Sequence, residues 1–358
     1  MTEDTPEFTD ILAITSKMGC GSSMDSFDEP KTVVVFGATG LLGGSVARAL
    51  LNDPFKFRVR CVTRKKNSDK ARELAELGTY GAVIVNANLD DTKSLEKALA
   101  NADAMFLTTH FWEEKNKQKE IVQGLNAIDA AVSCGVSHII FNGSENVKKL
   151  IGRDCNHLDS KFSIEEYIRE VDTEEGEGRA PTSPDDEDKT LGLNYTILRL
   201  PFWYENFYTV FKPYKLKYGV YALALPLEDG ALDCMAVEDV GECVYDILCK
   251  PRLYYGKTLG LCADRLSLAN VVDIFNKHFD TMKFKDPKMK IRDYENFKFS
   301  GAKDLAAMFE FYKDGTCVRD IKLTKKLNSR IKSFDKWMDE NKDYVEEAIR
   351  VDEELDQA

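Results

Sequence analysis

The sequence predicts an α/β protein in which a doubly wound parallel sheet is followed by a smaller α+β lobe. Through the first half of the chain, apolar strand-like runs alternate with segments of helical periodicity. Such alternation specifies a parallel sheet with right-handed crossover connections. The chain has 358 residues, which is too many for one minimal sheet of this kind and enough for an appended lobe.

The first strand and helix enclose the most informative motif. The valine-rich run 32–36 is typical of a buried parallel strand, and apolar residues at helical spacing follow in 42–52. Between them lie Gly37, Gly40 and Gly43, spaced Gly-x-x-Gly-x-x-Gly. We expect Gly37 to make the tight turn, Gly40 to let the backbone approach a pyrophosphate, and Gly43 to let the helix pack against the sheet. The free N–H groups of the helix N-terminus would attract the phosphates, so the unit predicts a Rossmann-type dinucleotide site.

The second strand indicates which dinucleotide binds. Residues 57–63 form this strand, and it ends in Arg64, Lys65 and Lys66. A carboxylate at this point would bond the ribose 2′-hydroxyl of NAD and would repel a 2′-phosphate. Arginine instead gives charge-assisted, bidentate bonds to phosphate. The sequence therefore predicts NADP(H), with Arg64 as the main contact and Lys65 or Lys66 assisting; the alternative is that these are solvated loop cations.

The remaining elements continue the alternation. Further strands are expected at 82–87, 103–109, 137–142 and 193–200, and helices at 69–77, 92–100 and 114–134. The acidic segment 172–190 is rich in Gly, Pro and Ser as well, so we expect a loop there. Shorter segments of mixed type are expected at 220–225, 239–249, 257–262, 267–279 and 334–350.

Three regions follow from this pattern. Residues 1–30 are polar and lack periodicity, so we expect them to be disordered. Residues 31–200 are expected to form the nucleotide-binding domain, with 172–190 as a loop insertion. Residues 201–358 are expected to form the C-terminal lobe that closes the cofactor cleft.

Composition narrows the class of protein. The formal net charge is −12, which disfavours direct binding to nucleic acid. Nine cysteines occur without a C-x-x-C pair and indicate a reducing compartment, so the cytoplasm is expected, with the nucleus as an addition. The four histidines are too dispersed to indicate a metal site. No apolar run reaches the ~20 residues of a membrane span.

A short motif near the N-terminus could anchor the protein to a membrane through acylation. Met18, Gly19 and Cys20 open the string Met-Gly-Cys-Gly-Ser-Ser, which fits an acylation signal if translation starts at Met18. Myristoyl and palmitoyl chains together would give stable anchoring. The alternative is a glycine–serine linker that matches by accident.

Several motifs together carry a resemblance to a known family. They are Val34–Gly40, Val62–Arg64, His157–Lys161, Glu165–Tyr167, Leu200–Asn206 and Gly301–Phe309. Over roughly residues 31–350 the chain resembles the NmrA-like family of atypical short-chain dehydrogenases/reductases, and most of all its animal NADP(H)-sensor subgroup (HSCARG type). Residues 1–30 and 172–190 depart from that subgroup's pattern.

The resemblance implies a Rossmann core, a smaller C-terminal lobe and a cofactor cleft between them. It implies regulation of partner proteins of unknown identity rather than metabolic turnover, and leaves a homodimer open. The NADP(H) contacts that it implies are Gly37, Ala38, Thr39, Gly40, Leu41, Leu42, Arg64, Leu89, Asp90, Thr108, Thr109, His110, Lys161, Trp203, Tyr204, Glu205 and Asn206.

Some of these residues also have plainer interpretations. Asp90 and Asp91 begin a predicted helix and would cap it. His110 is either a cofactor contact or a loop histidine. Trp203 and Tyr204 follow Pro201 and are interpreted as lobe packing rather than as a substrate box.

Catalysis can be judged from a side-chain pair. Reductase relatives use Tyr-x-x-x-Lys on a helix, since positions four apart share one helix face. Ser144 follows the strand 137–142, so the pair is expected at His157 and Lys161: the lysine is present and the tyrosine is absent. We therefore predict a redox sensor without turnover. The alternative is an NADPH-dependent quinone or carbonyl reductase that uses Lys161, with or without His157.

Three further candidates for proton transfer are weak. The literal strings Tyr208/Lys212 and Tyr294/Lys298 lie far beyond the cofactor half and are interpreted as chance. His157 could transfer a proton near neutral pH. Its plainer interpretation is a helix-surface or capping histidine.

Overall fold

The computed structural model describes residues 29–176, 193–216, 219–315 and 317–355. The expectations for residues 1–28, including the motif at Met18, Gly19 and Cys20, lie outside the described residues, as do those for 177–190. Among the residues that are described, no helix is both long and apolar enough to cross a membrane.

A seven-stranded parallel sheet organises the molecule, and it confirms the predicted fold class. The strands are β1 (Lys31–Val35), β2 (Phe57–Thr63), β3 (Val83–Asn86), β4 (Ala104–Leu107), β5 (His138–Gly143), β6 (Asn194–Arg199) and β11 (Lys257–Gly260). Their order is β11-β6-β5-β4-β1-β2-β3. The chain reverses direction across the sheet between β1 and β4, and open sheets of this class bind ligands in the crevice at such a switch point.

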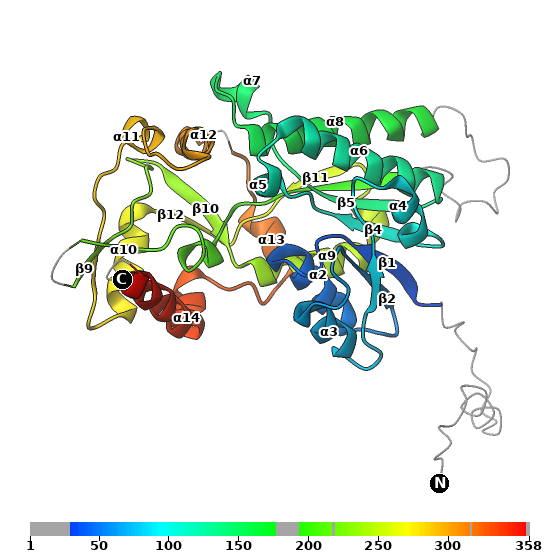
Figure 1. The fold of residues 1–358 in the computed structure, drawn as a ribbon, viewed down its shortest axis with the longest axis horizontal. Coiled ribbons are helices and arrows are strands. Elements are labelled where there is room, and N and C mark those ends of the chain that lie inside the picture. The colour runs from blue at the N-terminus through cyan, green and yellow to red at the C-terminus, as the bar shows by residue number, and fades with distance from the viewer. Residues whose placement is uncertain (1–28, 177–192, 217–218, 316, 356–358) are drawn as a thin grey trace, which may run out of the picture.

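Helices cover both faces of the sheet (Figure 1). Side chains alternate along β1, so that Val33 and Val35 face one layer while Val34 faces the other. The first layer holds α2 (Leu41–Leu51) and α9 (Val237–Cys249), with α3 (Asp69–Glu76) beside β2 and β3. The second layer holds α4 (Thr92–Leu99), α6 (Lys117–Ser133) and α8 (Asn156–Gly176). Burial on both faces explains why the first strand is nearly all valine.

The chain returns to this domain after it has entered the lobe. Helix α9 crosses α2 so closely that a Cβ added at Gly241 would lie 2.3 Å from the backbone oxygen of Ser45. Strand β11 pairs with β6 as the outermost strand of the sheet. Both elements come from the segment that we expected to belong wholly to the lobe. Periodicity shows that they exist, but it does not show which neighbour they pair with.

The lobe consists of two small sheets and several helices (Figure 1). Buried aromatic side chains are prominent in its core. Its strands are β7 (Phe202–Trp203), β8 (Tyr214–Lys215), β9 (Val220–Ala222), β10 (Ala231–Met235), β12 (Asp264–Ser267) and β13 (Lys283–Lys285). Its helices are α10 (Leu268–His278), α11 (Ile291–Glu295), α12 (Ala302–Lys313), α13 (Ile321–Leu327) and α14 (Phe334–Leu355), with a 3₁₀ turn at Tyr204–Phe207. A second 3₁₀ turn, Pro251–Leu253, connects α9 with β11.

Two expected elements need correction. The helix expected at 114–134 begins later, as α6 at Lys117, and a separate single turn, α5 (Phe111–Glu114), precedes it, because Lys115 between them adopts a left-handed φ of 50°. Asn116 then caps α6 by accepting a hydrogen bond from the Lys119 N–H at 3.0 Å. The loop expected from residue 172 begins later, since α8 runs to Gly176. The first residues of the acidic segment include glutamates, which favour a helix. The start of the acidic run therefore does not coincide with the end of α8.

Candidate functional site

The glycine turn between β1 and α2 has the geometry that its spacing predicts. Gly37 adopts a φ of +67°, a conformation that favours glycine, and its backbone oxygen accepts the Gly40 N–H at 2.9 Å. A Cβ added at Gly43 would lie 2.4 Å from the same oxygen, so only glycine allows α2 to pack this close. The expected roles of Gly37 and Gly43 are confirmed. Gly40 is the N-cap of α2 and has no side chain to cap the helix, which leaves its first N–H groups available to an anion.

A cavity of about 500 Å³ opens at the carboxyl ends of β1 to β4. Its lining includes seven of the expected cofactor residues: Gly37, Thr39, Arg64, Lys65, Leu89, Thr108 and His110. It also includes seven polar residues that sequence reasoning missed: Ser68, Asp69, Lys70, Asn88, Glu113, Glu114 and Gln123. Most of these missed residues lie on loops or first helical turns that follow the strands, a position that could have drawn attention to them.

Arg64 is held by a carboxylate across this cavity. Its Nη1 lies 2.6 Å from Oε1 of Glu113, and both side chains are largely exposed. This hydrogen bond raises the pKa of Arg64 and holds the pKa of Glu113 below its ordinary value. His110 lies beside the pair, with Nδ1 3.8 Å from Oε2 of Glu113. The cation that we predicted for a 2′-phosphate is therefore in place, but it is already paired.

Other expected contacts of this half take different positions. Lys66 is exposed and lies outside the cavity lining. Asp90 accepts a hydrogen bond from Nε2 of Gln123 at 3.0 Å, and it is Asp91 that caps α4. The predicted capping role is thus confirmed for Asp91 and wrong for Asp90.

Lys161 is bound to a buried glutamate. Its Nζ forms an ion pair with Glu120 and donates to the side-chain oxygen of Thr109 at 3.0 Å. Ser160 also donates its hydroxyl to Glu120. Burial disfavours the ionised form of Glu120, but Lys161 and these hydrogen bonds outweigh it and hold its pKa below the ordinary value. Nothing in the sequence pattern marked Glu120, which lies 41 residues before Lys161.

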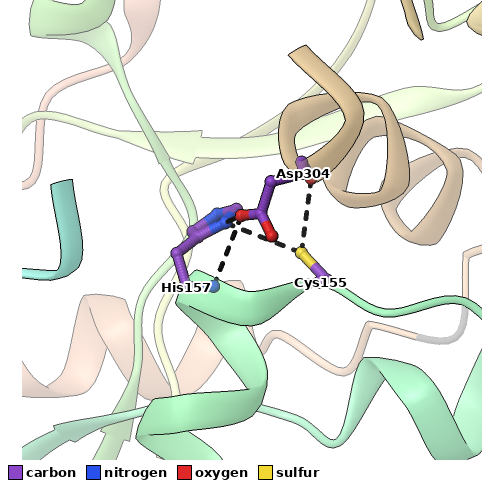
Figure 2. Close-up of side chains that lie close together, drawn as sticks. All are labelled: Cys155, His157 and Asp304. Carbon is purple, nitrogen blue, oxygen red and sulfur yellow. Dashed lines mark hydrogen bonds and ion pairs between the residues drawn. The ribbon is translucent and has the colours of Figure 1, made fainter. Parts of the chain in front are cut away.

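His157 lies in a buried cluster with Cys155 and Asp304 (Figure 2). Its Nδ1 bonds the Asp304 carboxylate, which also accepts the Asn156 N–H at 2.5 Å and the His157 N–H at 3.3 Å. Asp304, on α12 of the lobe, therefore caps α8 of the Rossmann domain. The helix-surface interpretation of His157 is wrong, because the ring is buried; the capping interpretation describes its surroundings better.

The same cluster has the residue types of a metal site. One ligand-type atom from each of Cys155, His157 and Asp304 lies within 4.8 Å of the others. Burial, and then the nearby carboxylates of Asp304 and Asp159, raise the pKa of Cys155 well above its ordinary value, so the thiol is protonated. Sequence reasoning missed this cluster, since Asp304 lies 147 residues from His157.

The segment after Pro201 packs into the lobe. Tyr204 is fully buried and donates its hydroxyl to Asp264 at 2.8 Å. Glu205 is 3% exposed and accepts the Val237 N–H at 3.0 Å, while burial raises its pKa to about 7. The packing interpretation is confirmed for Tyr204. Neither Tyr204 nor Glu205 belongs to the cavity lining, and their contact with a cofactor stays a prediction. Trp203 and Asn206 are half-buried and lie outside the cavity lining.

The alternative catalytic groups lack activation. Tyr208 stacks on Trp337 at 5.9 Å, and burial raises its pKa to about 12. Burial also raises the pKa of Tyr294 to about 12. Glu145, directly after Ser144, is buried in an ion pair with Arg319 from the lobe. A proton-transfer tyrosine needs a lowered pKa, so both literal Tyr-x-x-x-Lys strings fit the chance interpretation.

The sequence is similar to a known protein family and to several of its members. The chain matches the model of the NmrA-like family over residues 29–175 and 187–343. It is 28% identical over 253 residues to an NmrA-like family domain-containing protein of Dictyostelium discoideum, covering 69% of this chain and 77% of that protein. It is 27% identical over 265 residues to an NmrA-like family domain-containing oxidoreductase of Aspergillus japonicus, covering 68% and 71%.

Solved structures agree with the fold. Structures of NmrA, a negative transcriptional regulator, in complex with NAD and with NADP each superpose with a TM-score of 0.69 and 18% identity. Each covers 92% of this chain and 99% of the other. At this identity the likeness concerns the fold.

Proposed function

The chain belongs to the NmrA-like family, and on that premise we propose that it binds NADP(H) and that the bound nucleotide regulates its association with other proteins. One observation carries the nucleotide part of this proposal. A single cavity has the glycine turn of β1 among its lining residues and also Arg64 at the end of β2. A dinucleotide that spans the switch point needs both features, one for its pyrophosphate and one for its ribose.

The cations near the end of β2 support a 2′-phosphorylated nucleotide, and the same lining also holds three carboxylates, those of Asp69, Glu113 and Glu114. Arg64, Lys65 and Lys70 line the cavity on the side of β2 and α3. Their cationic groups suit a phosphate, whereas NAD-selective sites place an acid at the end of this strand. NmrA, which shares the fold, has been solved with NADP and also with NAD, so the family fold accommodates both.

A regulatory role is supported by the absence of an activated catalytic pair among the described residues. Lys161 forms an ion pair with Glu120 and a hydrogen bond with Thr109, and the His157 ring bonds Asp304. The assignment to the animal sensor subgroup rests on sequence motifs alone. The proposal includes protein partners and a cytoplasmic or nuclear location. The location is supported by the eight cysteines of the described residues, which are all free thiols, as is typical of a reducing compartment.

An NADPH-dependent reductase is the second candidate. Several relatives are named oxidoreductases, including the Aspergillus japonicus protein, and Lys161 occupies the expected position of the catalytic lysine. Against it stand the missing tyrosine and the Lys161–Glu120 ion pair.

Two measurements test these proposals. Calorimetric titration with NADP⁺, NADPH, NAD⁺ and NADH should show tighter binding of the phosphorylated pair; equal affinities would contradict the cofactor assignment. NADPH oxidation with a panel of quinones should be negligible. Substantial turnover that is lost in Lys161→Ala would establish the reductase instead.

A further inference from the structure

The single-turn helix α5 connects the nucleotide cavity with the lobe. It begins after His110, three residues beyond the end of β4, spans Phe111–Glu114 and ends at the left-handed residue Lys115. Successive residues of one helical turn point in different directions, so α5 can contact two partners at once.

One face of α5 contacts the nucleotide cavity. Glu113 lines it and bonds Arg64 at 2.6 Å. Arg64 is the residue that the proposed function assigns to the 2′-phosphate. The carboxylate of Glu113 takes one of the five N–H donors of the guanidinium, and it places a negative charge beside the proposed phosphate position, so the two anions repel each other.

The other face of α5 contacts the lobe. Trp112 packs on Gly301, where an added Cβ would lie 2.6 Å from the indole ring. Its ring centroid lies 4.9 Å from that of His157. Lys115 donates its Nζ to the backbone oxygen of Ser300 at 3.3 Å. A shift of α5 would therefore change the surroundings of an indole at the boundary between the domains.

We propose that Glu113 is a specificity-determining residue, which holds Arg64 in the ligand-free protein and is displaced by the 2′-phosphate of NADP(H). NAD(H) offers only a neutral 2′-hydroxyl, which does not compete with a carboxylate for a guanidinium. Only the phosphorylated nucleotide thus releases Glu113 and with it α5 and Trp112. This inference rests on the proposed function and adds to it the device that distinguishes the two nucleotides.

Removing the carboxylate tests the competition. Glu113→Gln should bind NADP⁺ about two- to fivefold more tightly than the wild type, the range expected for loss of an exposed ion pair, with NAD⁺ affinity unchanged. In an Arg64→Ala background the same substitution should have little effect, because there is no guanidinium to release. Glu76→Gln removes an equal charge from an exposed position of α3 outside the cavity and is the matched control.

Tryptophan fluorescence tests the connection to the lobe. NADP⁺ should change the emission of the wild type, NAD⁺ should not, and the change should be lost in Trp112→Phe. Unaltered NADP⁺ affinity in Glu113→Gln, or an equal gain in the Arg64→Ala background, would overturn the inference while leaving the proposed function intact. A wild type that binds no nucleotide would overturn both.

Discussion

Replacement of Arg64 by alanine is the mutation whose effect the structure defines best. Arg64 is the first residue after β2, and it lines the cavity next to Lys65. Its guanidinium bonds Glu113 at 2.6 Å. Arg64→Ala therefore removes the proposed partner of the 2′-phosphate without touching the glycine turn.

The size of the effect follows from two opposing contributions. A charge-assisted hydrogen bond contributes roughly 1.5–3 kcal/mol. Displacing Glu113 costs up to about 1 kcal/mol, the range measured for exposed ion pairs, and both side chains here are largely exposed. A net loss of about 0.5–3 kcal/mol remains, which weakens NADP⁺ binding roughly 2- to 150-fold.

Calorimetric titration of NADP⁺ and NAD⁺ measures this difference directly. NAD⁺ affinity should change by less than about twofold, because NAD⁺ carries no phosphate at this place. Lys66→Ala is the matched control, since it removes a cation from the same loop but outside the cavity lining. Equal losses for both nucleotides in Arg64→Ala, or an equal effect of Lys66→Ala, would refute the reasoning.

Three further substitutions test other parts of the structure. Gly40→Val should abolish nucleotide binding in calorimetry while the protein still folds, because the extended backbone of Gly40 is open to valine. An added Cβ would lie 3.3 Å from the Gly37 backbone oxygen, so the melting temperature should fall modestly. Glu205→Gln should remove a pH-dependent loss of stability. The pKa of Glu205 is raised from 4.5 to about 7, so the folded state holds its proton more tightly and the wild type loses stability as pH rises through this window, by about 3 kcal/mol. Denaturant unfolding should therefore show the variant gaining on the wild type at about pH 8 but not at about pH 4.5. Asp304→Asn should lower the free energy of unfolding by about 2–4 kcal/mol, because an amide keeps one acceptor oxygen, whereas the two carboxylate oxygens now accept the Asn156 and His157 N–H groups separately.

Each of these has a contrary result. Normal NADP⁺ binding by Gly40→Val would remove the turn from the site. A gain for Glu205→Gln that is the same at both pH values would mean that ionisation of Glu205 is not its cause. Unchanged stability of Asp304→Asn would show that the link between α8 and α12 contributes little.

Local sequence predicted those parts of the site that depend on local geometry. The positive φ of Gly37 and the close approach at Gly43 both arise within one strand–turn–helix unit, so spacing alone identifies them. Arg64 was found in the same way, because it directly follows a recognisable strand.

The missed features depend on contacts between distant segments. Glu113 meets Arg64 across 49 residues, and Asp304 meets His157 across 147. A single left-handed residue, Lys115, ends α5 and separates it from α6, and hydrophobic periodicity does not reveal such a residue. The return of α9 and β11 to the Rossmann layers likewise follows from tertiary packing.

A crystal structure of the protein with NADP⁺ would test the central claim most directly. The account predicts the pyrophosphate against the turn from Gly37 to Gly40, the 2′-phosphate bonded to Arg64, and Glu113 moved away from that guanidinium. A nucleotide bound elsewhere, or one that leaves the Arg64–Glu113 pair unbroken with its phosphate in solvent, would contradict it.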